Sequence, residues 1–294
     1  MQQAWKKRTD LALEARDLLA EGGADVTKLP GIRAREERVG PCLVTRVQVL
    51  DQEGAESLGK PPGDYITLEL PPEIRWEEAA PQLTELLANQ LRSLLPESGA
   101  VLVAGLGNRR LTADAVGPLT LEHLLVTRHL QEVEALSSLR PVAAVEPGVL
   151  AVTGCETAEL LQGLVKTLRP AALIAVDALA ARRSHRLCRS IQLGSSGLTP
   201  GSGVGNHRRA LNEETLGIPV IALGVPTVVD CATMLLDALE EAGAALPETF
   251  SCSGFVTPED IDLQVERLGR LLGRGITLAL QPGLTQQDLT ALMG

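Results

Sequence analysis

The sequence contains very few aromatic residues. Two Trp, one Tyr and two Phe make up only 2% of its 294 residues, and they are scattered along the chain. Proteins that grip single-stranded nucleic acid stack its bases on aromatic rings, so this composition argues against such a partner. The formal net charge of −10 also repels phosphate backbones and attracts basic partners. We therefore expect no direct binding to nucleic acid.

Cysteine and histidine are equally sparse. The five cysteines include no C-x-x-C pair, and an odd number without regular spacing predicts reduced thiols in a cytosolic setting. The four histidines form no short metal-ligand motif with one another or with the cysteines. We expect neither a metal ion nor another cofactor.

Long hydrophobic runs are absent from the sequence. The first ten residues, MQQAWKKRTD, are basic, but Glu14, Arg16 and Asp17 interrupt the apolar residues that follow. A signal peptide needs an apolar segment at this point, and a membrane-spanning helix needs about 20 predominantly apolar residues. The sequence therefore predicts a cytoplasmic protein without a membrane segment.

The first hundred residues change their hydrophobic period. Residues 10–21 have the spacing of a capped helix. Residues 41–70 alternate or are rich in β-branched side chains around a turn at 59–63, which predicts a small β-hairpin or antiparallel edge. Residues 77–95 have the spacing of an amphipathic helix.

From residue 100 onward, apolar strands alternate with helices. Continuous apolar runs, typical of strands buried on both faces, lie at 100–108, 141–150, 171–177, 186–194 and 218–229. Helices are expected at about 114–130, 157–168 and 230–243, with a C-terminal helix over 257–294. This alternation predicts an α/β fold with a doubly wound, mostly parallel sheet flanked by helices, to which the hairpin is a small N-terminal addition.

Asp114 lies where open α/β sheets bind their ligands, beyond the carboxyl end of a strand. It follows the first apolar strand through the loop GLGNRRLTAD. A dinucleotide-binding loop needs G-x-G-x-x-G, but Arg110 occupies the position of the third glycine, so the loop does not support a nucleotide cofactor. An isolated aspartate at a helix start also serves as a helix cap, and this alternative stays open.

Asp177 ends another apolar strand, in the segment AVDALAAR. A buried carboxylate lowers stability unless it is paired or used in function. The structural alternative is an ion pair with Arg182 or Arg183. The small residues around Asp177 indicate that another group approaches it closely.

A glycine-rich loop, LTPGSGVGNHR, occupies residues 198–208. Its backbone N–H groups can cradle an anion or an oxyanion, and the loop lacks the G-K-S or G-K-T ending of a nucleotide-binding P-loop. The candidate substrate-binding or oxyanion residues are Gly201, Gly203 and Gly205, together with Asn108 after the first strand. A flexible connection is the structural alternative.

Two carboxylates that share a cleft can perform acid–base chemistry. One pKa then rises, and the pair holds a single proton. One member takes a proton from water, while the other polarises the scissile carbonyl or protonates the leaving amine. No Ser-His-Asp or Cys-His pairing is visible from the spacing. The strand-end positions of Asp114 and Asp177 permit such a pair without requiring it.

Several segments resemble the germination protease family of spore-forming bacteria. They are GLGNRRLTADAVGPLTLEHLLVTRHL, PGVLAVTGCETAELLQGLVKTLRP, ALIAVDALAAR, PGSGVGNHR and TLGIPVIALGVPTVVD. The resemblance covers about residues 8–230 and resumes in FVTPEDIDLQVERLGRLLGRGITLAL. It implies a metal-independent, atypical aspartic peptidase that degrades small acid-soluble spore proteins in the spore core at germination. It also implies a tetrameric zymogen with a fold similar to that of the hydrogenase maturation endopeptidases.

The resemblance also implies roles for particular residues. By motif position, the two essential aspartates of the family fall on Asp114 and Asp177. The segment RTDLALEA matches the segment at which family members cleave themselves. This match implies that residues 1–10 are a propeptide removed between Asp10 and Leu11, which leaves residues 11–294 as one peptidase domain. A capped helix start is the structural alternative.

The sequence departs from the family pattern at several positions. Arg109 stands where an aromatic residue is usual, Ala113 replaces a proline and Glu146 replaces an uncharged residue. The segment 194–196 is less acidic, and the region between residues 230 and 255 is shortened. If Glu146 points into the crevice, we expect it to alter the pKa of the acid pair.

Two other functions remain as alternatives. A hydrogenase-maturation-type peptidase, which recognises nickel in its partner, usually adds a histidine ligand to the two acids, and no histidine lies at an obvious strand end. A catalytically silent scaffold with the same fold is the second alternative. The presence of both aspartates and of the self-cleavage segment argues against it.

Overall fold

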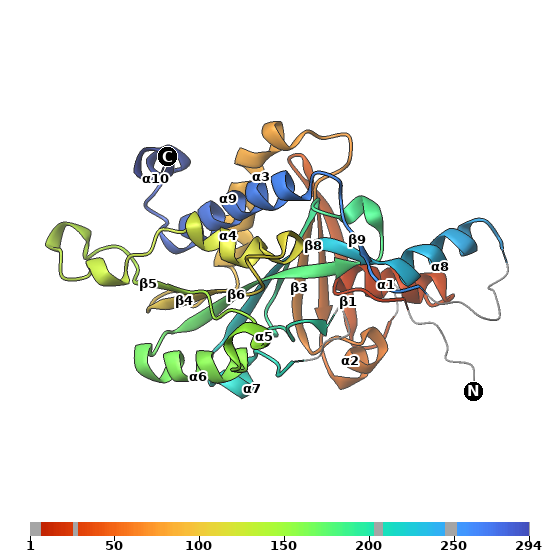
Figure 1. The fold of residues 1–294 in the computed structure, drawn as a ribbon, viewed down its shortest axis with the longest axis horizontal. Coiled ribbons are helices and arrows are strands. Elements are labelled where there is room, and N and C mark those ends of the chain that lie inside the picture. Colours follow the sequence, from red (N-terminus) through yellow and green to blue (C-terminus); the bar gives the residue numbers. More distant parts are fainter. Residues whose placement is uncertain (1–6, 26–28, 203–207, 245–251, 294) are drawn as a thin grey trace.

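One mixed β-sheet runs through the molecule, and the helices lie around it (Figure 1). The computed structural model describes residues 7–25, 29–202, 208–244 and 252–293. Within these residues the sheet has nine strands in the order β1-β2-β3-β7-β8-β6-β4-β5, and β9 pairs with β8.

The sheet has a parallel half and an antiparallel half. The parallel strands are β4 (Val101–Gly105), β5 (Val142–Val145), β6 (Ala172–Ala181) and β8 (Val220–Asp230). The antiparallel strands are β1 (Ile32–Val39), β2 (Cys42–Val49), β3 (Gly63–Glu69), β7 (Ser190–Gly194) and β9 (Phe255–Val256). The predicted α/β class is confirmed, although the antiparallel half is larger than the expected hairpin.

Two elements of the antiparallel half were not expected from the sequence. The edge strand β1 reads IRAREERV, and only its first residue is buried. Exposed edge strands commonly carry charged side chains, which prevent pairing with other chains. For this reason β1 shows no alternation of apolar and polar residues. Between β2 and β3 lies the short helix α2 (Gln52–Leu58), capped by the carboxylate of Asp51, where a turn alone was expected. The expected strand 186–194 begins only at Ser190 and runs antiparallel to β8.

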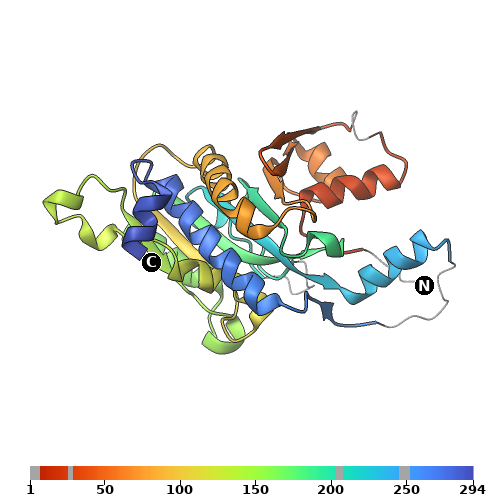
Figure 2. The same ribbon diagram turned by 90° about the horizontal axis from the view of Figure 1, so that it is seen from above.

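Helices cover both faces of the sheet (Figures 1 and 2). The α-helices are α1 (Ala12–Glu21), α3 (Trp76–Arg92), α4 (Val116–Glu122), α5 (Leu150–Thr153), α6 (Thr157–Leu168), α7 (Glu213–Leu216), α8 (Cys231–Glu241), α9 (Ile261–Leu280) and α10 (Gln286–Met293). Short 3-10 turns are η1 (Thr112–Asp114), η2 (Arg128–Leu130), η3 (Glu134–Leu136) and η4 (Ser184–Arg186). The expected helix 114–130 is therefore much shorter, and two helices replace the expected C-terminal one. Within the described ranges, no helix combines the length and the apolar character needed to cross a bilayer.

Alternate side chains of the central strands enter two different cores. Val101 and Val103 of β4 pack into a core shared with α3, α4 and α9. Leu102 and Ala104 face the opposite side, where α6 and α7 complete a second core. This period of two explains why β4 and β6 read as continuous apolar runs, since both faces of these strands are covered.

Glycines allow α4 to approach the sheet very closely. A Cβ on Gly117 of α4 would lie 2.2 Å from the carbonyl oxygen of Leu106 and 2.6 Å from that of Val176. A Cβ on Gly105 would lie 2.5 Å from the carbonyl oxygen of Gly117. Because these neighbours are backbone atoms, no side chain can be accommodated without moving α4. The close contact holds η1, which ends at Asp114, beside β6.

The substitution Gly117→Ala tests this contact. The added methyl group should lower the free energy of unfolding by about 1–3 kcal/mol, as overpacking of an interior does, and a urea denaturation curve measures the loss. Gly163→Ala in α6 is the matched control, since a Cβ there has nothing within 4 Å. The control should instead gain about 0.4–1 kcal/mol from the reduced entropy of the unfolded chain. Equal stability of Gly117→Ala and the parent chain would contradict the close packing.

Candidate active site

A cleft of about 440 Å³ opens beside the carboxyl half of β6. Its walls come from the turn after α2, from η1, from β6, β7 and β8, and from the loop at 196–202. Asp114, Asp177, Asp10 and Gly201 all line it. The fold therefore brings together in one cavity two strand-loop segments and the N-terminal segment, which are far apart in the sequence.

Asp177 lies where β6 loses one of its neighbours. The pairing of β4 with β6 ends at Val176, whereas β6 itself continues to Ala181 alongside β8. Asp177 is therefore inside the strand rather than at its end, and one edge of β6 is open beyond it. Asp177 is only 7% exposed as a residue, and its carboxylate accepts a hydrogen bond from the N–H of Ala178 at 3.0 Å.

The expected ion pair of Asp177 with Arg182 or Arg183 does not form. The Arg182 guanidinium binds Asp237 with two nitrogens at 2.7–2.9 Å and Glu21 at 2.7 Å. Arg183 pairs with Glu21 and Glu241. Both arginines thus belong to a separate cluster of charges, and neither of them neutralises the Asp177 carboxylate.

Asp114 is held by its own loop rather than acting as a helix cap. Its carboxylate accepts a hydrogen bond from the N–H of Asn108 at 2.8 Å, while α4 begins after Ala115 without a side-chain cap. Gly107, at φ 106°, makes this possible, because a Cβ there would lie 2.0 Å from the carbonyl oxygen of Asp114. The Asn108 N–H is therefore occupied by Asp114 rather than free to bind an oxyanion.

A bulge in β8 fixes the other side of this loop. Leu179 pairs with Pro226 and Ala180 with Val228, so Thr227 is an extra residue in β8. The Thr227 hydroxyl donates to the carbonyl oxygen of Ala113 at 2.6 Å. Bulges often redirect a side chain beside an active site, and this one ties the residue before Asp114 to the central strand.

The two aspartates are electrostatic neighbours. Burial raises the pKa of Asp177 well above its usual value, and the charges of Asp114 and Asp10 raise it further. The hydrogen bond from the N–H of Ala178 lowers this pKa but does not offset the other effects. Burial also raises the pKa of Asp114, although the hydrogen bond from the N–H of Asn108 lowers it in part. Both carboxyls therefore hold a proton more readily than a free aspartate does, and the charge of Asp114 adds to this effect at Asp177.

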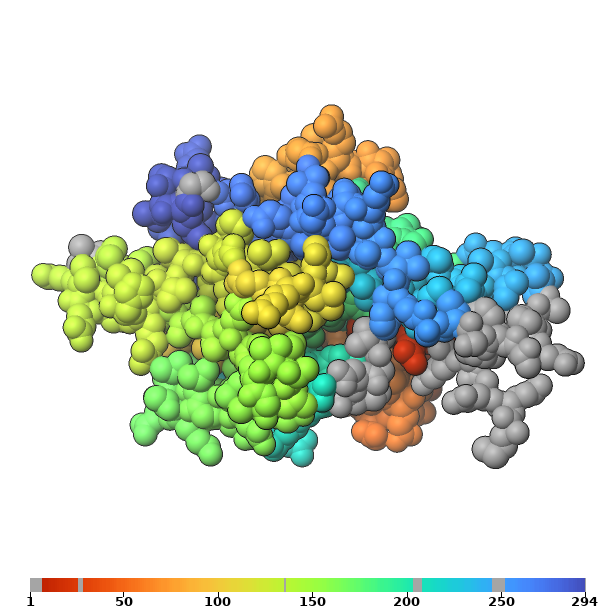
Figure 3. All heavy atoms as spheres, viewed as in Figure 1, coloured from red at the N-terminus to blue at the C-terminus, as the bar shows by residue number. Residues whose placement is uncertain are grey.

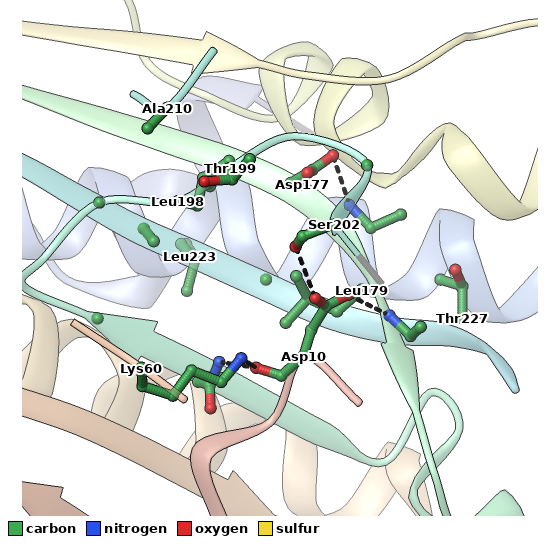
Figure 4. Close-up of a pocket in the computed structure, with 18 of the residues that line it drawn as sticks. Asp10, Lys60, Asp177, Leu179, Leu198, Thr199, Ser202, Ala210, Leu223 and Thr227 are labelled. Carbon is green, nitrogen blue, oxygen red and sulfur yellow. Dashed lines mark hydrogen bonds between the residues drawn. The ribbon is translucent and has the colours of Figure 1, made fainter. Parts of the chain in front are cut away.

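Asp10 lines the cleft beside the open edge of β6 (Figure 4). Its N–H donates to the carbonyl oxygen of Ala180 at 2.9 Å. Its carboxylate accepts from the N–H of Ala180 at 2.9 Å and from the hydroxyl of Ser202 at 2.8 Å. The open edge of β6 therefore holds Asp10 by one backbone hydrogen bond, and the Asp10 carboxylate takes a second N–H of the same edge, where sheet edges bind peptides.

The carbonyl oxygen of Asp10 accepts two further hydrogen bonds. The Lys60 ammonium donates at 2.9 Å and the Gln192 side-chain amide at 3.1 Å. The next residue, Leu11, is fully buried in a small apolar cluster with Ala181, Leu187 and Val229. The bond between Asp10 and Leu11 is thus flanked by polar groups on one side and an apolar pocket on the other.

Residues on both sides of this bond are also anchored. Glu14 is 1% exposed and accepts from the N–H groups of Arg182 at 2.6 Å and Arg183 at 2.9 Å. The Lys7 ammonium lies 2.6 Å from the Asp237 carboxylate. In the space-filling view, only a small red patch of this segment is visible on the face shown (Figure 3). Residues 7–14 are therefore anchored at several points along this stretch.

Several lining residues could not be identified from the sequence. Lys60 stands in a stretch that reads as a turn, and Gln192 is one polar residue in an apolar strand. Ser202 lies in the expected glycine-rich loop, next to Gly201, which adopts φ 73°. The expected residues Gly203 and Gly205 lie outside the described residues.

Two departures from the family pattern are partners of each other. Arg109 binds the Glu146 carboxylate through Nη2 at 2.8 Å and also pairs with Glu122. Glu146 does not point into the cleft as considered above, because its charge is directed to this exposed arginine. The charges of Arg109 and Glu146 therefore neutralise each other, and neither residue lines the cleft that holds Asp114 and Asp177.

No three His, Cys, Asp or Glu side chains of the described residues converge as a metal site would require. Likewise, none of the cleft-lining residues that the structure describes is a histidine.

Comparison with known proteins identifies several similar chains. A profile of the family described as germination protease matches residues 12–242. The germination protease of Caldanaerobacter subterraneus subsp. tengcongensis is 41% identical over 97% of this chain and 98% of its own length. That of Clostridium tetani is 38% identical over 97% of this chain and 99% of its own length. Among solved structures, the nickel–iron hydrogenase maturation protease HycI of Thermococcus kodakarensis is 18% identical, with a TM-score of 0.37 over 64% of this chain and 98% of that chain.

The raised pKa of Asp177 predicts how stability depends on pH. Because the folded state binds this proton more tightly than the unfolded state, the folded state loses stability as the pH rises above about 3.9, the ordinary aspartate value, towards the raised pKa. Asp177→Asn removes this loss, so its stability relative to the parent chain should increase from pH 4 to pH 7. Thermal unfolding across this range measures the difference.

Asp288→Asn is a control of opposite sign. Hydrogen bonds from Thr285 lower the pKa of the exposed Asp288, so its contribution to stability is present above the unfolded pKa and lost at lower pH. This variant should be less stable than the parent chain at pH 7 and approach it in acid. A pH-independent difference for Asp177→Asn would contradict the buried pair.

Proposed function

The chain belongs to the germination protease family, and from this premise we propose that it is an aspartic-type endopeptidase that first cleaves itself between Asp10 and Leu11. One observation carries the proposal: Asp114 and Asp177 line the same cleft as Asp10, the residue before the Asp10–Leu11 bond. Residues 1–10 would then be the propeptide, and residues 11–294 the peptidase domain.

The pKa shifts support an assignment of roles within the pair. Asp177 is the more buried acid and faces the charges of both Asp114 and Asp10, so we assign the shared proton to Asp177. Asp114 is then the ionised member, stabilised by the N–H of Asn108. A carboxylate of this kind can act as a general base, and a neutral carboxyl as a general acid.

The proposed reaction is a hydrolysis by an activated water. Asp114 removes a proton from water while the water oxygen forms a bond to the carbonyl carbon of Asp10. The tetrahedral intermediate then collapses, the C–N bond breaks, and Asp177 gives its proton to the leaving nitrogen of Leu11. The products are a carboxyl group on Asp10 and an amino group on Leu11, and one water is consumed.

The way the N-terminal segment is bound supports a class of substrate. The backbone hydrogen bond from Asp10 to the open edge of β6 and the extended backbone of Leu11 suit an extended peptide, which a folded protein does not offer without unfolding. We propose small acid-soluble spore proteins as the substrates, in the cytoplasm of the spore core, because the family resemblance implies them. A homotetramer is proposed on the same basis.

The hydrogenase-maturation alternative gains no support from the cleft. A nickel-dependent site of that kind would add a histidine to the two acids, and the described lining residues include none. The scaffold alternative is likewise unsupported, because the acid pair and the self-cleavage segment occur together.

Replacing either member of the pair should strongly slow self-cleavage. Asp114→Asn and Asp177→Asn each remove one partner of the proton transfer, so the rate constant should fall by about 10²–10⁴-fold. Intact mass after incubation of the full chain measures the loss of residues 1–10. Because the segment lies in the cleft of its own chain, the parent rate constant should not change on dilution.

Asp288→Asn, at the exposed start of α10, is the matched control and should cleave at the parent rate. Full activity in either active-site variant would remove that residue from the mechanism. An intact mass that never loses residues 1–10 under any pH would refute self-cleavage.

A further inference from the structure

Lys60 is presented to the cleft by a rigid turn. It follows Gly59, which ends α2 at φ 68°, and precedes Pro61 and Pro62, whose rings fix the backbone. Its ammonium reaches the carbonyl oxygen of Asp10 at 2.9 Å. The position of this cation is thus determined by the backbone as well as by its own contacts.

Gln192 of β7 donates to the same oxygen. Its side-chain nitrogen donates to the carbonyl oxygen of Asp10 at 3.1 Å, and its side-chain oxygen accepts from the N–H of Ala12 at 2.7 Å. The second contact orients the amide, because an oxygen must face the Ala12 N–H. One side chain therefore spans the peptide bond between Asp10 and Leu11.

The charge of Lys60 is not neutralised by a direct ion pair. Within the described residues, no carboxylate lies at ion-pair distance from its ammonium. Burial lowers the pKa of Lys60, while the more distant charges of Asp10 and Glu14 partly oppose this by raising it. In a partly dehydrated site, the attraction between a cation and a carbonyl oxygen becomes strongest when that oxygen acquires negative charge. The environment therefore suits a charge that develops during reaction.

We propose that Lys60 is a catalytic residue that, with Gln192, stabilises the negative charge on the carbonyl oxygen of the residue before the cleaved bond. This inference rests on the proposed function. It divides the chemistry between two groups: the acid pair moves the protons of water and amine, while Lys60 and Gln192 bind the oxygen of the tetrahedral intermediate. The same donors would receive the corresponding carbonyl of a substrate.

Lys60→Met and Lys60→Arg in the full chain test the proposal. Methionine keeps an unbranched side chain but cannot donate, so the rate constant of self-cleavage, followed by intact mass, should fall by about 10²–10³-fold. Arginine keeps a cationic donor, so Lys60→Arg should cleave itself at least about tenfold faster than Lys60→Met. Lys166→Met, on the exposed face of α6, is the matched control and should cleave at the parent rate.

A peptide of sequence KRTDLALEARD separates catalysis from anchoring. Each variant is first allowed to finish self-cleavage, and its kcat and KM for the peptide are then measured. Loss of transition-state stabilisation lowers kcat with KM little changed, whereas loss of a ground-state anchor raises KM alone. A lowered kcat for Lys60→Met supports the proposal.

Three results would overturn the proposal. They are a kcat within threefold of the parent, an effect on KM alone, and equal losses in the Met and Arg variants. Asp177→Asn, assayed in parallel, keeps the two hypotheses distinguishable. If Asp177→Asn is inactive while Lys60→Met is not impaired, only the role of Lys60 fails, whereas an active Asp177→Asn contradicts the acid pair itself.

Discussion

A buried carboxyl, Asp177, and a partly buried one, Asp114, that line the same cleft are the constraint on which the rest of this structure depends. Their mutual repulsion and dehydration oppose folding, so the surrounding backbone must enforce their positions. The glycines at 105, 107 and 117 let α4 and its preceding loop approach the sheet, while Thr227 in the bulge of β8 ties down the same loop. These features lie in different elements, yet each contacts the segment that carries Asp114.

Much of the fold could be predicted from the sequence, because local periods report burial directly. The runs that became β4, β6 and β8 are apolar on both faces, and α3 and α9 show an amphipathic period. The edge strand β1 could not be predicted in this way, since an edge with one buried residue has no apolar pattern. The short helix α2 depends on a cap at Asp51 within a segment that otherwise reads as a turn.

The site was predictable only in part. Asp114 and Asp177 could be singled out because each follows an apolar run in the sequence, and their common cleft follows from the pairing of β4 with β6. Lys60 and Gln192 could not, because they lie 50 and 182 residues from Asp10 along the chain and no local pattern links them. Arg109 and Glu146 each looked like an isolated departure from the family pattern, and only their contact explains why both occur together.

The burial of Glu14 has a consequence for the enzyme after its first reaction. Hydrolysis after Asp10 would release residues 1–10, but the other product would remain attached to the enzyme through α1, held by the amides of Arg182 and Arg183. The new amino terminus at Leu11 would then compete with every incoming peptide at a high effective concentration, as any covalently linked ligand does. Turnover on other proteins would therefore be governed by how readily the first turn of α1 detaches.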